Sequence, residues 1–347
     1  MSMSPQSRHP AGPPVAVFGA AGHTGRFVVA ELRRRGIAPI AIARDAAALA
    51  AHFPGDEIPC RRASLDDAAS LDRALAGAGA VVNCAGPFLD TAGAVAAAAL
   101  RARAHYLDVT AEQASAQATL DTCDAAARDA GVVVLPAMGF YGGFADLLVT
   151  AALGDWDAAD AIEIMIGLDS WHPTRGTRLT GARNTAPRLV VAGGQLAPLP
   201  LPPAETQWAF GEPLGTQAMV ELPFSEIVLI ARHVKTVELH TYLNSLALED
   251  IRDPSTPPPQ PADATGRSPQ RFAVDAVVTR GAERRRIVAR GRDIYAFTAP
   301  LVCEVAGRLL DGRFGSAGAQ APGAILDARA VLEALAPDHL SFEIKTA

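Results

Sequence analysis

Lysine is the residue that this sequence lacks most clearly. Only Lys235 and Lys345 stand among 31 basic residues, so a mechanism that needs a lysine before position 235 is excluded. The formal net charge is -6, and the longest basic runs are the three arginines of 33–35 and of 284–286. Runs this short, on an acidic chain, give no basic face for phosphate-backbone contacts. We therefore expect no nucleic-acid partner.

Cysteines and long apolar stretches are also scarce. The four cysteines, Cys60, Cys84, Cys123 and Cys303, lie far apart, without a CxxC pair or a histidine at metal-ligand spacing. This pattern indicates neither a zinc site nor a disulfide framework, so we expect no bound metal. No apolar run reaches the roughly 18 residues of a membrane span, and residues 1–14 lack the apolar core of a signal peptide. We expect a cytoplasmic protein with no membrane span.

The first half of the chain repeats one structural unit. A length of 347 residues predicts about two domains. From Val15 onward, short β-type runs alternate with alanine-rich helical stretches, and strands separated by helices pair in parallel through right-handed crossovers. The pattern predicts an α/β fold with a doubly wound parallel sheet. Its strands are expected at 15–18, 39–43, 59–63, 80–84, 106–109 and 132–135.

After about Asp155 the rhythm changes to strand-like runs separated by turn signals. This predicts a second, α+β domain with a largely antiparallel sheet. The proline-rich stretch 252–271 is expected to be an exposed loop, and helices near 293–310 and 322–335 close the chain. The three expected segments are thus 13–153, 154–292 and 293–347, the last being helices that return to the first domain. The strand-like runs of the second domain are 162–168, 189–191, 226–230, 236–243, 272–278 and 286–289.

A glycine-rich turn directly follows the first strand and opens a helix. In this position Gly19 permits a tight turn, Gly22 lets the backbone approach a pyrophosphate, and Gly25 lets helix and strand pack closely. The positive helix N-terminus then attracts the anion. The spacing is GxxGxxG, a variant of the GxGxxG fingerprint, and a glycine turn without a ligand is the alternative. The pattern predicts a Rossmann-type dinucleotide-binding domain with these cofactor-binding residues: Gly19, Ala20, Ala21, Gly22, His23, Thr24 and Gly25.

The ends of the later strands suggest which dinucleotide binds. Arg44 stands where an NAD-specific protein would place an acidic residue on the ribose 2′-hydroxyl, and a guanidinium there can pair with a 2′-phosphate. We therefore expect NADP(H) in preference to NAD(H), unless Arg44 only pairs with the neighbouring helix. Ala63 and Ser64 are expected at the adenine edge. The small residues and rigid turn expected beside the nicotinamide ribose are Asn83, Cys84, Ala85, Gly86 and Pro87.

Several ordered motifs resemble the saccharopine dehydrogenase-like oxidoreductases. The resemblance implies an N-terminal domain that binds NADP(H) or NAD(H), hydride transfer, and an acceptor that the family does not specify. Two departures suggest that the substrate side has diverged: Ala111 replaces the usual glycine of a YxDxxGE pattern, and residues 141–146 read YGGFAD instead of DSxPxD. The motifs that carry the resemblance are 19–25, 82–88, 105–112, 136–140 leading to Asp146, and 293–299.

The proton donor is harder to place. A Tyr-x-x-x-Lys pair is excluded, because no lysine precedes Lys235. Tyr141 follows the sixth strand, where a phenol could donate a proton, or could instead pack at the domain junction. His172 lies in the polar segment 169–180, which could supply a general acid and bind a carboxylate or phosphate, or could be a solvated loop. The substrate-binding residues expected in that segment are Arg175, Thr177, Arg178 and Thr180.

Together these patterns predict an NADP(H)-dependent oxidoreductase. It would transfer hydride to or from a C=N, C=O or activated C=C bond of a small molecule, with residues 154–292 covering the nicotinamide and selecting the substrate. Two alternatives stay open: a nucleotide-sensing regulator without turnover, and a lyase or synthase that keeps NAD(P) bound through a hidden redox cycle. A homodimer is one option for the assembly.

Overall fold

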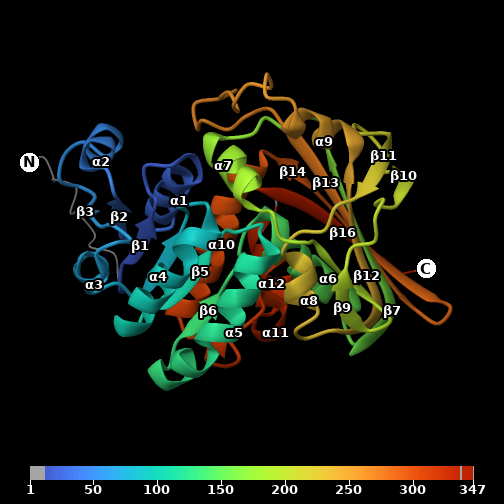
Figure 1. The fold of residues 1–347 in the computed structure, drawn as a ribbon, viewed down its shortest axis with the longest axis horizontal. Helices are drawn as coiled ribbons and strands as arrows, with labels where there is room; N and C mark the ends of the chain where they lie inside the picture. The colour runs from blue at the N-terminus through green and yellow to red at the C-terminus, as the bar shows by residue number, and fades with distance from the viewer. Residues whose placement is uncertain (1–11, 337, 347) are drawn as a thin grey trace, which may run out of the picture.

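The N-terminal half forms a twisted parallel sheet. The computed structural model describes residues 12–336 and 338–346. Within them, seven strands pair in parallel in the order β15-β6-β5-β4-β1-β2-β3 (Figure 1). The predicted doubly wound α/β fold is confirmed, and β15 from the end of the chain is an addition. The strands are β1 (Val15–Phe18), β2 (Pro39–Ala43), β3 (Cys60–Arg62), β4 (Ala80–Asn83), β5 (His105–Asp108), β6 (Val133–Leu135) and β15 (Gly318–Ala319).

Helices join these strands, and aspartate side chains cap two of them, α2 and α3. Asp45 caps α2 by accepting hydrogen bonds from the backbone N–H groups of Ala47 (2.9 Å) and Ala48 (3.2 Å). The cap of α3 is Asp67, which accepts from Ser70 N at 3.0 Å. The helices between the strands are α1 (His23–Arg34), α2 (Ala46–His52), α3 (Ala68–Leu75), α4 (Phe88–Arg101) and α5 (Gln113–Ala130).

The second sheet is mixed but mostly antiparallel. Its main path runs β10-β11-β12-β7-β13-β14-β16, where β12 and β7 pair in parallel and the other neighbours are antiparallel. Strands β13 and β14 form a hairpin. The strands are β7 (Ala158–Leu168), β8 (Leu189–Ala192), β9 (Gln195–Pro198), β10 (Glu205–Ala209), β11 (Thr216–Glu221), β12 (Lys235–Asn244), β13 (Arg271–Arg280), β14 (Glu283–Arg292) and β16 (Leu340–Thr346).

Two expectations for the second half were wrong. The run 226–230 is a helix, α8 (Glu226–Ile230), whose five residues are all buried. Short buried apolar runs look alike in helices and strands, because neither leaves a polar face. The end of the chain is also not purely helical: after α10 (Ile294–Leu310), α11 (Pro322–Ile325) and α12 (Ala328–Leu335), β16 pairs with β14 in the second sheet.

The two sheets share one buried core. A continuous apolar cluster runs from Val15 and Val17 in β1, through Phe297 and Leu301 in α10, to Val274 in β13. Figure 1 shows α10 between the two sheets, with α7 (Arg175–Arg183) above it. None of the nine residues of α7 is buried. The remaining elements at this junction are the turn Phe140–Phe144, α6 (Ala145–Leu153) and α9 (Ser245–Arg252).

Two features that bear on function are absent from the described residues. These residues contain no helix that combines the length and the apolar character needed to cross a bilayer. They also contain no group of three or more His, Cys, Asp or Glu side chains arranged to hold a metal ion.

Candidate functional site

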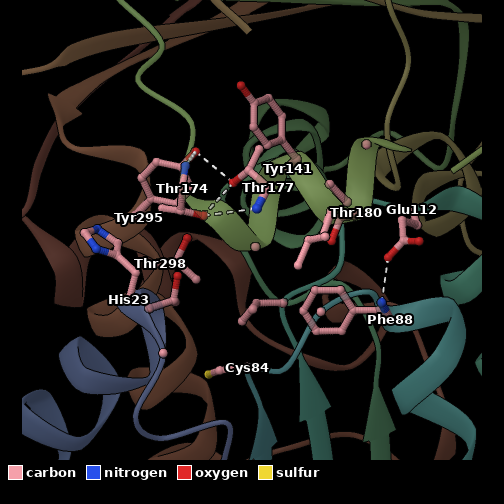
Figure 2. A pocket seen from close by; sticks show the side chains of 18 of the residues that line it. His23, Cys84, Phe88, Glu112, Tyr141, Thr174, Thr177, Thr180, Tyr295 and Thr298 are labelled. Atoms are coloured by element: carbon pink, nitrogen blue, oxygen red, sulfur yellow. Dashed lines mark hydrogen bonds between the residues drawn. The ribbon is translucent and has the colours of Figure 1, made fainter. Parts of the chain in front are cut away.

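A cavity of about 620 Å³ lies where the two sheets meet, at the carboxyl edge of the parallel sheet. One wall is the turn after β1 and the turn after β4, and the opposite wall comes from α7 and the loop before it (Figure 2). This volume is typical of small-molecule sites, which commonly lie at such junctions in doubly wound folds. The cavity is therefore the candidate active site.

The glycine turn has the geometry that its sequence predicts. Gly19 has a φ of +82°, which favours glycine. A Cβ on Gly25 would lie 2.2 Å from the carbonyl oxygen of Gly19, so the helix could not pack this closely with any other residue. Gly22 lines the cavity and is the N-cap residue of α1. No described side chain caps this end of the helix. The first N–H groups of α1 thus remain for a ligand.

His23 leaves a ring nitrogen without a partner beside this turn. Its Nε2 is buried and makes no hydrogen bond with the described residues. Burial lowers the pKa of His23, so the ring is neutral at neutral pH. The ring meets Phe27 and Tyr295 edge-on, at centroid distances of 5.3 and 5.5 Å. A buried polar atom without a partner is costly, and a bound ligand would satisfy it.

The turn after β4 is built for small residues. The buried side chain of Asn83 accepts a hydrogen bond from Ala85 N at 3.0 Å and donates to Thr91 and Tyr106, so it shapes the turn instead of reaching a ligand. A Cβ on Gly86 would lie 2.8 Å from Oγ1 of Thr180 on α7. The lining residues of this turn are Cys84, Ala85 and Gly86.

Two buried carboxyl groups stand behind this turn. Asp108 accepts hydrogen bonds from Thr110 N (3.0 Å) and Ala137 N (2.8 Å) and fixes both loops, while burial raises its pKa to about 6. Glu112 lines the cavity and accepts from Phe88 N at 2.8 Å (Figure 2). Its other oxygen has no described partner, and burial raises its pKa. The YxDxxGE-like motif contained Glu112, but the sequence did not indicate its place.

The substrate side of the cavity is aromatic. Tyr141 stacks on Trp171 at 5.2 Å and lies 4.2 Å from Phe224, measured between ring centroids. Its buried hydroxyl has no partner among the described residues, and burial raises its pKa well above that of a free phenol. Arg188 lines the same region, with its guanidinium 5.2 Å from the centre of the Phe224 ring and one N–H donated to Pro223 O at 2.6 Å. The sequence reasoning missed this cation.

Of the five site residues predicted in the polar segment 169–180, three line the cavity and two do not. Arg175, Thr177 and Thr180 line it. Arg178 instead donates to the carbonyl oxygens of residues 253 and 256, at 3.1 and 2.8 Å, and does not line the cavity. His172 is half-buried and is also absent from the lining. The expectations that Arg178 binds substrate and that His172 donates a proton there are therefore not kept.

The remaining predicted cofactor residues lie beyond this cavity. Arg44 is exposed at the end of β2, and its carbonyl oxygen accepts a hydrogen bond from Arg62 of β3 at 3.2 Å. Asp45, next to it, is occupied in capping α2. Ala63 and Ser64 follow β3 on the same edge of the sheet. Of the predicted set, Ala20, Gly25, Arg44, Ala63, Ser64, Asn83 and Pro87 do not line the cavity, whereas Gly19, Ala21, Gly22, His23, Thr24, Cys84, Ala85 and Gly86 do.

These features fit a dinucleotide. The uncapped helix end, the open side of Gly22 and the unpartnered Nε2 of His23 provide N–H groups and space for a pyrophosphate. The small turn after β4 continues the same wall toward the aromatic region. A dinucleotide held here would supply a hydride donor or acceptor, and the second sheet would supply the walls around the reacting carbon.

Comparisons with known proteins give one family model and similar solved structures. Residues 15–135 match the family model of the saccharopine dehydrogenase NADP binding domain. The fold is similar to that of saccharopine dehydrogenase (L-Glu forming) from Saccharomyces cerevisiae, with a TM-score of 0.67, 13% identity, and coverage of 97% of this chain and 100% of that one. GenD2 from gentamicin A biosynthesis, in complex with NAD, matches with a TM-score of 0.42, 15% identity and 99% coverage of both chains. No curated protein matches the chain.

Proposed function

We propose that the chain is an NADP(H)-dependent oxidoreductase of the saccharopine dehydrogenase-like type, and the match of residues 15–135 to that family's NADP binding domain supports this proposal. The reaction is hydride transfer to or from a C=N, C=O or activated C=C bond of a small molecule. The observation that carries this proposal is the cavity itself. It joins an uncapped, glycine-lined helix end on one side to an aromatic region that contains the Arg188 guanidinium on the other.

Each wall of the cavity has a part in this proposal. The first turn of α1 and the glycine loop hold the pyrophosphate through backbone N–H groups. Arg44 pairs with the 2′-phosphate, which favours NADP(H) over NAD(H). The small turn after β4 leaves room for the nicotinamide ribose. Tyr141, Trp171 and Phe224 hold the apolar part of the substrate, and Arg188 attracts an anionic or carbonyl-bearing group.

Cellular context forms a minor part of the proposal. All four cysteines are free thiols in the structure, as is usual in a reducing compartment. We therefore keep a cytoplasmic location and a small-molecule partner. Oligomerisation, including a homodimer, is open to measurement by light scattering.

Isotope transfer tests the proposal directly. Purified protein is incubated with NADPH carrying deuterium at nicotinamide C4, together with probes for each bond type: ethyl pyruvate, 1-piperideine and 2-cyclohexen-1-one. We expect deuterium in the reduced form of at least one probe, by mass spectrometry. Tight NADPH binding with no turnover of any probe would favour the regulator. Cofactor retained through purification, with no net NADPH consumption, would favour the lyase or synthase.

A further inference from the structure

A chain of hydroxyl groups lies in the wall of the cavity, and the role inferred for it rests on the proposed function. The Tyr295 hydroxyl lies 2.9 Å from Oγ1 of Thr177, which in turn lies 2.9 Å from Oγ1 of Thr174. Figure 2 shows the three side chains pointing toward one another across the cavity, from α10 on one side and α7 on the other. All three residues line the cavity.

Lone-pair counting fixes the direction of this chain. The Tyr295 oxygen already accepts two N–H groups, from the indole of Trp171 at 3.0 Å and from the backbone of Thr174 at 3.4 Å. A phenol oxygen has no further acceptor position, so its own proton goes to Thr177. Thr177 then donates to Thr174. The hydroxyl proton of Thr174 is left for an acceptor in the cavity.

We propose that Tyr295 is the proton source of the reaction and that its proton reaches the substrate through the hydroxyls of Thr177 and Thr174. Thr174 is the catalytic residue that touches the substrate heteroatom, and Thr177 and Tyr295 act through it. When a C=X bond is reduced, the carbon gains the hydride that a bound reduced nicotinamide supplies. The heteroatom takes the Thr174 proton, each hydroxyl is restored by its neighbour, and Tyr295 becomes a phenolate.

The surroundings of Tyr295 suit this role. The N–H groups of Trp171 and Thr174 donate to the Tyr295 oxygen and therefore stabilise the phenolate directly. Burial raises the pKa of Tyr295, and its hydrogen bonds with Thr177 and Trp171 oppose that rise. The titratable groups facing it are Asp293, the neutral His23 ring and Tyr141. Water restores the phenol when product leaves.

Backbone strain holds Tyr295 in place. Asp293, the N-cap of α10, has a φ of +58°, a conformation that non-glycine residues rarely adopt. Its carboxylate stabilises this conformation by accepting hydrogen bonds from Tyr295 N (3.1 Å), Ala296 N (3.0 Å) and Ser268 N (2.6 Å). Strained residues of this kind concentrate at functional sites, where precise placement offsets their cost.

Tyr141 is the weaker candidate for the same role. Its hydroxyl has no partner among the described residues, so nothing there stabilises its anion or returns its proton. Its ring instead stacks on Trp171 and lies tilted against Phe224. We therefore assign Tyr141 to substrate contact and the proton to Tyr295.

Matched variants separate a relay from a simple tether. Tyr295→Phe removes the proton, Thr177→Val breaks the chain at nearly constant volume, and Thr177→Ser keeps the hydroxyl. Thr150→Val is the control, because the Thr150 hydroxyl donates to Asp146 O on α6 and does not line the cavity. NADPH affinity is measured for every variant by fluorescence titration.

The first readout needs no substrate. The chain has four tyrosines, so 3-fluorotyrosine labelling gives a simple ¹⁹F NMR spectrum in which Tyr295→Phe identifies the Tyr295 resonance. Thr177→Val should raise the apparent pKa of Tyr295, because the phenolate loses a donor, and Thr177→Ser should restore it. A Tyr295 titration that is the same in wild type and Thr177→Val would overturn the proposal.

The second readout is reduction of the three probes with NADPH across neutral and alkaline pH. We expect kcat to fall about 100-fold in Tyr295→Phe and Thr177→Val, the size of a lost general acid, at unchanged NADPH affinity. Thr177→Ser should recover most of that loss, and Thr150→Val should match wild type. Wild-type kcat and pH dependence in Tyr295→Phe would overturn this proposal alone. A wild type that reduces no probe would overturn the oxidoreductase assignment together with it.

Discussion

Replacing Arg44 with alanine should separate the two nicotinamide cofactors. The guanidinium stands at the end of β2, beside the expected adenosine ribose, and no ion pair involving it occurs among the described residues. The nearest carboxylate in sequence, Asp45, caps α2 through Ala47 and Ala48. Arg44 is therefore available for a 2′-phosphate, whereas NADH offers only a hydroxyl there.

The size of the effect follows from exposure. Hydrogen bonds to charged groups contribute about 1.5–3 kcal/mol, and the exposed position of Arg44 places it at the low end because solvent screens the pair. A loss of about 1.5 kcal/mol corresponds to roughly tenfold weaker NADPH binding. NADH affinity should stay within about twofold of wild type, since no charge is lost there.

Fluorescence or calorimetric titration with both cofactors measures this difference. Arg33→Ala is the control, because Arg33 is exposed on α1 and pairs with Glu57 at 2.7 Å, away from the cofactor residues. Added salt should weaken NADPH binding to wild type more than to Arg44→Ala. Equal losses for NADPH and NADH in Arg44→Ala would refute the 2′-phosphate assignment.

Three further predictions concern packing, pH and the α7 region. Gly25→Ala, whose Cβ would lie 2.2 Å from Gly19 O, should lower the free energy of unfolding by about 1–3 kcal/mol in urea, whereas Gly93→Ala, with open space around its Cβ, should not lower it; equal stability of the two variants would contradict the close packing. Burial raises the folded pKa of Asp108 to about 6 from an ordinary 3.8. The stability that its protonated form contributes to the fold is therefore fully present below pH 3.8 and is lost as pH rises through 6, about 3 kcal/mol in all. In Asp108→Asn, the free energy of unfolding should depend less on pH between 3.8 and 6 than in wild type. Parallel pH curves for the two proteins would argue against the raised pKa of Asp108. Arg178→Ala should speed hydrogen exchange at residues 253–256, whose carbonyls it binds, without changing ligand affinity; a large loss of substrate affinity would return Arg178 to the site.

Local patterns predicted the cofactor half of the fold well. Turn- and cap-forming glycine, proline and aspartate residues flank the six strands of the first half, so the positions of these strands followed from the sequence. The role of Gly25 as a packing glycine also follows from spacing alone, and a Cβ at this position would lie 2.2 Å from Gly19 O. The roles of Gly22 and Arg44 toward a ligand stay predictions.

The substrate half depended on tertiary contacts that sequence spacing does not contain. The sequence predicts 169–180 as one polar segment, but from Arg175 onward it belongs to the helix α7, whose faces have different surroundings. Thr177 and Thr180 lie on the cavity face, and Arg178 turns toward residues 253–256. Tyr295 and Arg188 reach the cavity from distant parts of the chain. Only the folded structure brings them to the same cavity.

Calorimetric titration of wild type and Gly22→Val with NADPH tests the central claim most directly. Gly22 lines the cavity, and its Cβ would meet only Gly19 O, at 3.1 Å, so a valine side chain would occupy the space assigned to the pyrophosphate. We predict saturable binding to wild type and at least ~100-fold weaker binding to Gly22→Val, a loss of roughly 2.7 kcal/mol, with the same far-UV circular dichroism. No heat of binding to wild type, or equal affinity in the two proteins, would contradict the account.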